Sequence, residues 1–178
     1  MTDARASLLP GPLLEAAGRV VEAHRAAGTM VAVAESCTGG LVAAALTEIP
    51  GSSDVLDAGF VTYSNEAKVA MLGVSEEVIE TFGAVSVATA WGMAQGALAR
   101  SRADVAVAIT GIAGPAGGSE RKPVGTVVFA RARRGADPKD IFADTRPFGD
   151  LGRGGVRLQA ALCALELLMP PSPDAPSP

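Results

Sequence analysis

The stretch MVAVAESCTGGLVAAALTEI, residues 30–49, contains the pattern that decides the fold. Its first five residues are apolar and carry valine at alternate positions, which predicts a short buried strand. The glycine-rich sequence ESCTGG follows, and the alanine-rich segment 41–49 then predicts a helix that ends before Pro50. A strand, a tight turn and a helix in succession are typical of α/β proteins.

The same alternation continues along the chain. Helices are predicted over residues 12–27, 64–72, 75–82, 87–100 and 154–169, and further strands over residues 55–63, 104–110, 124–133 and 140–148. Gly135 and Pro138 separate the last two strands, which predicts a hairpin at one side of the sheet. Strands that are almost continuously apolar are buried on both faces, so we predict a three-layer α/β/α sandwich around a mixed, mostly parallel sheet.

The chain has 178 residues, a length that fits one domain with a sizeable core. Neither an internal repeat nor an interdomain linker is visible in the sequence. We therefore expect a flexible N-terminus over residues 1–12, a single domain over residues 13–169, and a disordered tail rich in proline and serine over residues 170–178.

Charge and composition exclude several classes of protein. A net charge of -4 argues against an electrostatic nucleic-acid binder, which needs a basic face. No apolar run approaches the roughly 20 residues that span a bilayer, so we expect no membrane partner. The N-terminus lacks the pattern of a secretory signal, and a reducing, cytoplasmic location is therefore expected.

Cysteine and histidine are too scarce for a metal site. Cys37 and Cys163 have no metal-ligand spacing, and His24 is the single histidine, so we expect no metal. A Ser-His-Asp triad would require His24 as its base. His24 lies in the predicted helix 12–27, away from the glycine-rich turns, which favours an ordinary histidine of an amphipathic helix over a catalytic one.

Two glycine-rich turns, 35–40 and 110–118, each follow a buried strand. Ligands of open α/β sheets bind outside the carboxyl ends of the strands, so these turns are the natural place for a site. Exposed N–H groups there favour anions and developing oxyanions. Neither turn matches a P-loop or a GxGxxG fingerprint, and both are also compatible with simple tight turns in a glycine-rich protein.

Ser36 is the candidate nucleophile, because it lies between a strand and the start of a helix. The alternative is that Ser36 or Thr38 only caps that helix. A serine nucleophile needs a base, and among the three lysines Lys68 falls in the first turn of helix 64–72, where the helix dipole and burial both lower a lysine pKa. Tyr63, the only tyrosine, ends the preceding strand and could relay a proton or orient the ammonium. A surface lysine and a half-buried tyrosine are the alternative interpretation.

Five motifs occur in the order found in a known family. They are AESCTGG (34–40), GFVTYSNEAK (59–68), GAVS (83–86), TGIAGP (110–115) and KPVGTV (122–127). With them the chain resembles, from Leu13 to Met169, the CinA C-terminal domain family of nicotinamide-nucleotide amidohydrolases (NMN deamidases). Longer members carry an additional N-terminal domain, so the resemblance implies the stand-alone form of the enzyme, without a cofactor and as a homodimer.

The resemblance implies hydrolysis of nicotinamide mononucleotide (NMN) to nicotinic acid mononucleotide and ammonia, in pyridine nucleotide recycling. It places the nucleophile at Ser36 and gives the handling of the proton to Tyr63 and Lys68. Backbone N–H groups of Thr38, Gly39 and Gly40 would hold the oxyanion. A catalytically silent nucleotide- or partner-binding module of the same fold, or an amidase for a different amide, are the alternatives.

The remaining candidate residues would bind substrate. The loop of Thr110, Gly111 and Gly114 would approach the ribose or the phosphate, and Glu35 would either orient the surroundings of Ser36 or bind ribose hydroxyls. Segment 149–155 is about two residues longer than the family's Gly-Asp-Arg pattern, so Arg153, Arg157 and Lys122 all remain candidates for the phosphate. Cys37, beside the nucleophile, is expected to be a buried, inert thiol.

Overall fold

The structure is a computed structural model that describes residues 7–137 and 139–170. The helices are α1 (Gly11–Ala27), α2 (Leu41–Thr47), the 3-10 turn η1 (Ser52–Asp54), α3 (Asn65–Leu72), α4 (Glu76–Phe82), α5 (Val87–Ala99) and α6 (Gly152–Leu168). The strands are β1 (Val31–Glu35), β2 (Leu56–Val61), β3 (Val105–Gly111), β4 (Thr126–Arg133) and β5 (Phe142–Pro147).

The five strands form one sheet in the order β2-β1-β3-β4-β5. β1 lies between β2 and β3 and is parallel to both, whereas β4 is antiparallel to both β3 and β5. Strands β1, β2, β3 and β5 therefore point the same way, and β4 alone is reversed. This confirms the predicted mixed, mostly parallel sheet and the hairpin formed by its last two strands.

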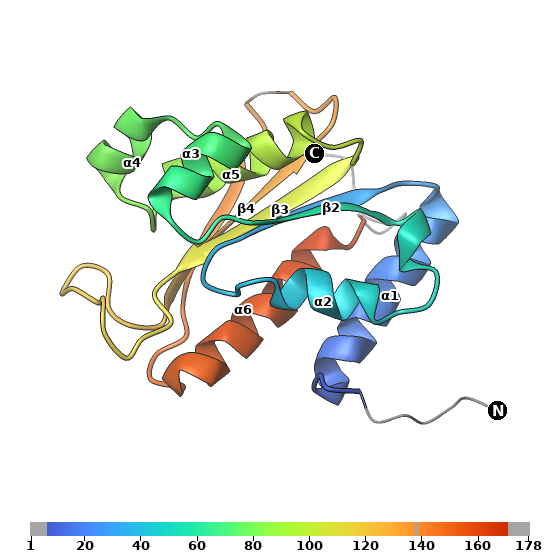
Figure 1. Cartoon of the computed structure of the whole chain (residues 1–178), viewed down its shortest axis with the longest axis horizontal. Helices are drawn as coiled ribbons and strands as arrows, with labels where there is room; N and C mark the ends of the chain where they lie inside the picture. The colour runs from blue at the N-terminus through green and yellow to red at the C-terminus, as the bar shows by residue number, and fades with distance from the viewer. Residues whose placement is uncertain (1–6, 138, 171–178) are drawn as a thin grey trace.

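Helices cover both faces of the sheet, which confirms the three-layer sandwich. Figure 1 shows α1, α2 and α6 on one side of the strands and α3, α4 and α5 on the other. Side chains alternate between the faces along a strand, so the two faces have different compositions. Bulky residues of the sheet pack on the first group of helices (Val31, Val33, Val107, Ile109 and Phe129), and alanines pack on the second (Ala32, Ala34, Ala106, Ala108 and Ala130).

The alanine face lets α5 approach the sheet and α3 closely. Gly96 of α5 lies so near the end of α3 that an added Cβ would overlap the carbonyl oxygen of Leu72. Small side chains on α5 thereby hold α3, and with it Lys68, against the carboxyl end of the sheet.

Several predicted boundaries were wrong by about two residues: α2 ends at Thr47 rather than at 49, β2 ends at Val61 rather than at 63, and β5 begins at Phe142 rather than at 140. Helix α6 begins at Gly152 rather than at Gly154 or Gly155, because no capping side chain marks its start and the glycines there are ambiguous. Strand β4 begins at Thr126 rather than at residue 124, since Gly125 adopts a positive φ of 91° that no strand residue has.

The chain ends fall largely outside the described residues. Of the expected flexible N-terminus, residues 1–6 are not described, and α1 already begins at Gly11. The expected disordered tail is not described beyond residue 170. Within the described part of the chain, no helix has the length and apolar character that crossing a bilayer requires.

Candidate active site

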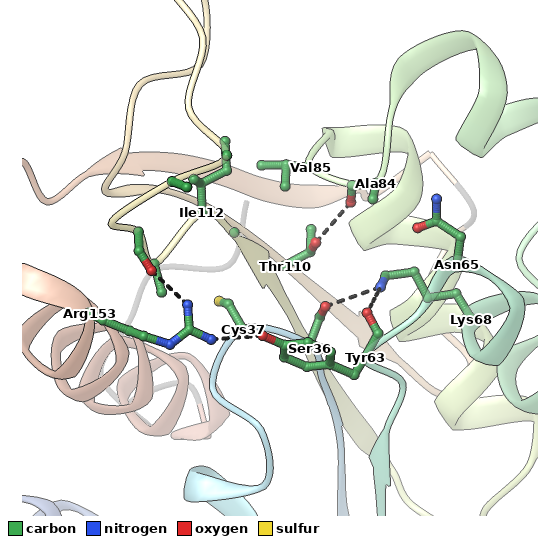
Figure 2. A pocket seen from close by; sticks show the side chains of 15 residues that line it. Ser36, Cys37, Tyr63, Asn65, Lys68, Ala84, Val85, Thr110, Ile112 and Arg153 are labelled. Carbon is green, nitrogen blue, oxygen red and sulfur yellow. Dashed lines mark hydrogen bonds between the residues drawn. The ribbon is translucent and has the colours of Figure 1, made fainter.

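A cavity of about 270 Å³ opens where β1, β2 and β3 reach their carboxyl ends. Its lining comes from the two glycine-rich turns, the start of α3, the segment before α5 and the start of α6 (Figure 2). The lining residues are Ser36, Cys37, Tyr63, Asn65, Lys68, Ala84, Val85, Thr110, Gly111, Ile112, Ala113, Gly114, Ala116, Gly117 and Arg153.

Ser36 is held rigidly in the turn after β1. Its N–H donates to the carbonyl of Ile109 at 2.9 Å, and its own carbonyl accepts from the N–H of Gly39 at 3.0 Å. Gly39 and Gly40 have φ values of 61° and 93°, the left-handed region in which glycine avoids strain. The paired glycines of the motif therefore make the turn that presents Ser36 to the cavity.

Glu35 holds the start of α2. Its carboxylate accepts hydrogen bonds from the N–H groups of Gly40 (3.1 Å), Val42 (3.2 Å) and Ala43 (2.9 Å). Neither Ser36 nor Thr38 caps α2, because Glu35 binds these amides from inside the fold. The Glu35 side chain is fully buried and does not line the cavity. Of its two predicted roles, the structure favours orientation of the Ser36 turn and contradicts a contact with ribose.

Lys68 reaches Ser36 from α3, although the two residues are far apart in sequence. Its Nζ lies 3.1 Å from Ser36 Oγ, and the side chain is only 1% exposed (Figure 2). Burial lowers the pKa of Lys68 from its ordinary value. A lowered pKa increases the fraction of neutral amine, the form that can act as a base.

The other contacts of Lys68 decide which proton it can accept. Its Nζ also lies within hydrogen-bond distance of three backbone carbonyls, those of Thr62 (2.9 Å), Tyr63 (3.3 Å) and Ser64 (3.4 Å). Carbonyl oxygens only accept hydrogen bonds, so they hold the N–H groups of the amine. Of the four neighbouring oxygens, only Ser36 Oγ carries a proton that the amine lone pair can take.

The Tyr63 hydroxyl does not join this pair. It accepts a hydrogen bond from Nη2 of Arg153 at 2.8 Å, and Tyr63 as a residue is 60% exposed. Among the residues drawn in Figure 2, no hydrogen bond links this hydroxyl to Ser36 or Lys68. The predicted proton relay through Tyr63 is therefore not assembled in this structure, and Tyr63 contacts Lys68 through its backbone carbonyl instead.

The three candidates for phosphate binding lie in different places. Only Arg153, in the first turn of α6, lines the cavity. Arg157 donates instead to the carbonyl of Thr38 at 2.9 Å, and Lys122 donates to the carbonyl of Phe82 at 3.0 Å. Each of these two cations holds a backbone carbonyl, and both lie outside the cavity lining, so the structure does not bring either of them to the cavity as a contact with substrate requires.

The predicted oxyanion hole requires a correction. The N–H of Gly39 is bound to Ser36 and that of Gly40 to Glu35, and neither glycine nor Thr38 lines the cavity. In the described part of the chain, the N–H groups of Cys37 and Thr38 have no partner in another residue. Only Cys37 of these two lines the cavity, so its amide replaces the 38–40 set as the candidate for binding an oxyanion.

The second glycine-rich turn lies where it was predicted. Thr110, Gly111 and Gly114 all line the cavity. The Thr110 hydroxyl donates to the carbonyl of Ala84 at 2.8 Å, which joins this turn to the segment before α5. A Cβ on Gly111 would lie 2.8 Å from Val127 Cγ2, 3.0 Å from the Thr126 carbonyl oxygen and 3.1 Å from Cys37 Sγ, so a side chain there would crowd both β4 and the first turn.

Cys37 is buried beside the nucleophile. Burial raises the pKa of its thiol to about 11, and the thiol therefore stays protonated at neutral pH. This agrees with the predicted inert thiol.

Sequence reasoning missed part of the cavity wall. Asn65, the first residue of α3, is exposed and lines the cavity, and Val85 and Ile112 add apolar surface. Asn65 could have been found from its place three residues before Lys68, because residues three apart share one side of a helix. Val85 belongs to the GAVS motif (83–86) and Ile112 to the glycine-rich turn 110–118, so the sequence analysis marked both segments without naming these two side chains. Among the described residues, no three His, Cys, Asp or Glu side chains gather in a way that could hold a metal ion.

Comparison with known proteins adds independent information. A family model described as the CinA C-terminal domain matches residues 14–170. The nicotinamide-nucleotide amidohydrolase PncC of Escherichia coli strain K12 is 51% identical over 159 residues, which cover 88% of this chain and 92% of that protein. PncC of Enterobacter agglomerans is 54% identical over 144 residues, which cover 81% of this chain and 85% of the relative.

Longer relatives and solved structures match as well. A putative competence-damage inducible protein of Symbiobacterium thermophilum is 53% identical over 162 residues, and the chain spans only 37% of its length. The crystal structure of the competence/damage inducible protein CihA of Agrobacterium tumefaciens superimposes with a TM-score of 0.87 at 54% identity. That match covers 91% of this chain and 96% of the solved one.

Proposed function

Because the chain belongs to the CinA C-terminal domain family, we propose that it hydrolyses the carboxamide of NMN to nicotinic acid mononucleotide and ammonia. Two relatives that carry the name nicotinamide-nucleotide amidohydrolase, and that the chain covers over most of their length, support the amidohydrolase class. The observation that carries the proposal is the 3.1 Å contact between Lys68 Nζ and Ser36 Oγ inside the cavity.

The first step is attack by serine. The neutral amine of Lys68 takes the proton of Ser36 Oγ as this oxygen bonds to the carboxamide carbon. The carbonyl π electrons move to oxygen, and the N–H group of Cys37 binds the resulting oxyanion. The carbonyls that surround Lys68 stabilise its new ammonium form.

The second step releases ammonia and restores the enzyme. The Lys68 ammonium gives its proton to the leaving nitrogen, the C–N bond breaks, and an ester between Ser36 and the nicotinoyl group of the nucleotide remains. Lys68 then accepts a proton from a water molecule that attacks this ester. The proton returns to Ser36 Oγ when the C–O bond breaks and the carboxylic acid product leaves.

The shape of the cavity fits an extended substrate. Figure 2 shows Lys68 and Arg153 on opposite sides of Ser36 and Cys37, with Val85 and Ile112 above them. A carboxamide placed at Ser36 leaves the apolar side chains for the pyridine ring and Arg153 for the phosphate at the other end. Arginine suits this role because its planar guanidinium donates two parallel hydrogen bonds to phosphate oxygens.

An assay of the purified protein tests the proposed activity. NMN is added, ammonia and nicotinic acid mononucleotide are measured, and NMN binding is followed by calorimetry with the Ser36→Ala variant. We expect stoichiometric formation of both products. Binding of NMN without any product would instead support the catalytically silent module. Absence of both binding and turnover, with release of ammonia from a different amide, would support the amidase of other specificity.

Three further expectations follow from the same proposal. The activity would convert NMN to its deamidated form, nicotinic acid mononucleotide, and so would serve the recycling of pyridine nucleotides. A homodimer is expected from the apolar composition together with the family resemblance, and the expected cytoplasmic location is kept as part of the proposal. Sedimentation of the purified chain tests the dimer, and a single species at the mass of one chain would contradict it.

A further inference from the structure

The contact between Tyr63 and Arg153 joins two elements across the mouth of the cavity. Nη2 of Arg153 donates to the Tyr63 hydroxyl at 2.8 Å, and Nη1 donates to the carbonyl of Gly114 at 2.7 Å. Tyr63 follows β2, Arg153 lies in the first turn of α6, and Gly114 belongs to the second glycine-rich turn. All three residues line the cavity (Figure 2).

Both partners of Arg153 accept hydrogen bonds and are uncharged oxygens, so the guanidinium keeps its positive charge without a counter-ion in this contact. A guanidinium has five N–H groups, and two of them serve these contacts. The remaining N–H groups stay available for an anion. The two contacts therefore fix the direction of the guanidinium and leave it able to bind.

We propose that the Tyr63 hydroxyl is a positioning group for Arg153, and so for the phosphate end of the substrate, rather than a group that moves the catalytic proton. The inference rests on the proposed function, because it assigns Arg153 to the NMN phosphate. Lys68 already contacts Ser36 directly, and this contact needs no phenol between the two side chains.

The physical basis is pre-organisation. A free arginine side chain has many rotamers, and binding an anion removes that freedom. A partner that already holds the guanidinium reduces the entropy lost when the phosphate binds. This contribution is made to binding in the ground state and the transition state alike, so its loss raises KM and leaves kcat nearly unchanged.

The main experiment measures kcat and KM for NMN with the wild type, Tyr63→Phe, Arg153→Met and the double variant. Phenylalanine keeps the ring and removes only the hydroxyl. We expect Tyr63→Phe to raise KM by about three- to tenfold, the loss of one hydrogen bond to a charged group near solvent. In the Arg153→Met background the same change should have no further effect, because the partner of the hydroxyl is gone.

Nicotinamide riboside, which lacks the phosphate, provides the second arm. With this substrate the penalty of Tyr63→Phe on kcat/KM should be much smaller than with NMN. Arg102→Met is the matched control for removing a cation, since Arg102 is 81% exposed and pairs with Asp57 outside the cavity lining.

A proton-transfer role would give the opposite pattern. A fall in kcat by about a hundredfold or more in Tyr63→Phe, repeated in the Arg153→Met background, overturns the proposal. Failure of the wild type to hydrolyse NMN would contradict the proposed function instead. The two failures are therefore distinguishable, since the first requires an active wild-type enzyme.

Discussion

At the scale of single residues, the chemistry depends on one buried amine. Lys68 is separated from Ser36 by 31 intervening positions, and the two meet because α3 packs where β1 ends. Three carbonyls that cannot donate a proton surround the amine, which leaves Ser36 as its only proton donor among these contacts. Burial lowers the pKa of Lys68 and so favours the neutral base.

The pH dependence of kcat follows from that lowered pKa. The base must be neutral, so activity should fall as the pH drops through the pKa of Lys68 and rise to a plateau above it. The plateau should be reached at lower pH than an ordinary lysine allows. Lys68→Arg should remain inactive at every pH, because a guanidinium does not lose its proton. A wild-type rate that increases toward acid pH would contradict this assignment.

Cys37 allows a prediction about reactivity. Its thiol has a pKa of about 11 and is 5% exposed, so little thiolate is present at neutral pH. Iodoacetamide should label Cys37 slowly in the folded protein and quickly in urea, and Cys37→Ala should keep most of the activity. Rapid labelling of native protein with parallel loss of activity would favour a cysteine mechanism.

Sequence reasoning found the candidate side chains that lie at strand ends or helix starts, and it missed contacts between residues that are far apart in the sequence. Ser36, Lys68 and the Thr110–Gly114 turn could be predicted, because each lies at a strand end or a helix start. The partners of Arg157 and Lys122 could not be predicted, because Thr38 and Phe82 come near them only in the folded chain. Both cations bind backbone carbonyls. Every residue has such a carbonyl, so the residue types do not indicate which one accepts the hydrogen bond.

At the scale of elements, the start of α2 depends on Glu35. Its carboxylate binds three N–H groups that would otherwise lie buried and unpaired. Glu35→Ala should lower the free energy of unfolding by about 2–3 kcal/mol, because these donors lose a charged acceptor. It should also lower kcat, since the Ser36 turn is held through the same amides. Urea unfolding and NMN turnover measure the two effects, and a variant unchanged in both would contradict the role of Glu35.

The packing of α5 on α3 gives a second prediction for an element. Gly96→Ala should destabilise the protein although alanine favours helices, since its Cβ overlaps the Leu72 carbonyl. Gly18→Ala is the matched control in α1, where a Cβ meets nothing within 4 Å. It should stabilise the protein by up to about 1 kcal/mol. Thermal unfolding of both variants checks the contrast, and equal shifts of Tm would contradict close packing at Gly96.

At the scale of the whole molecule, the proposed chemistry and the single histidine lie at opposite ends of the sheet. The cavity lies at the carboxyl ends of the strands, whereas His24 lies just before β1 begins, at the amino end. His24 is 1% exposed and contacts Thr29 Oγ1 at 2.8 Å and the Leu168 carbonyl at 2.7 Å. The single histidine therefore ties the end of α1 to the end of α6 and stands away from the proposed chemistry.

His24→Leu should separate stability from activity. The change leaves the buried Leu168 carbonyl without its donor, which should cost about 1–3 kcal/mol of unfolding free energy. The folded variant should hydrolyse NMN at close to the wild-type kcat. Loss of turnover in a variant that is still folded would reopen the possibility that His24 acts as a base.

The architecture of the molecule could be predicted because short sequence patterns indicate each strand and helix. Alternating valine and alanine in MVAVA and DVAVAIT predicts strands buried on both faces, and glycines or prolines mark most helix ends. The order of the strands in the sheet and the contacts that Arg153 of α6 makes could be found only from the structure. Nothing in the sequence near Arg153 indicates that its guanidinium meets Tyr63 and Gly114.

The central claim is that Ser36 attacks the carboxamide of NMN with Lys68 as its base. The most direct test is kcat/KM for NMN in Ser36→Ala, measured as ammonia release beside the wild type. The account predicts a loss on the order of 10⁴-fold or more in a variant that still folds and still binds NMN. A Ser36→Ala enzyme that kept its activity within about tenfold of the wild type would contradict it.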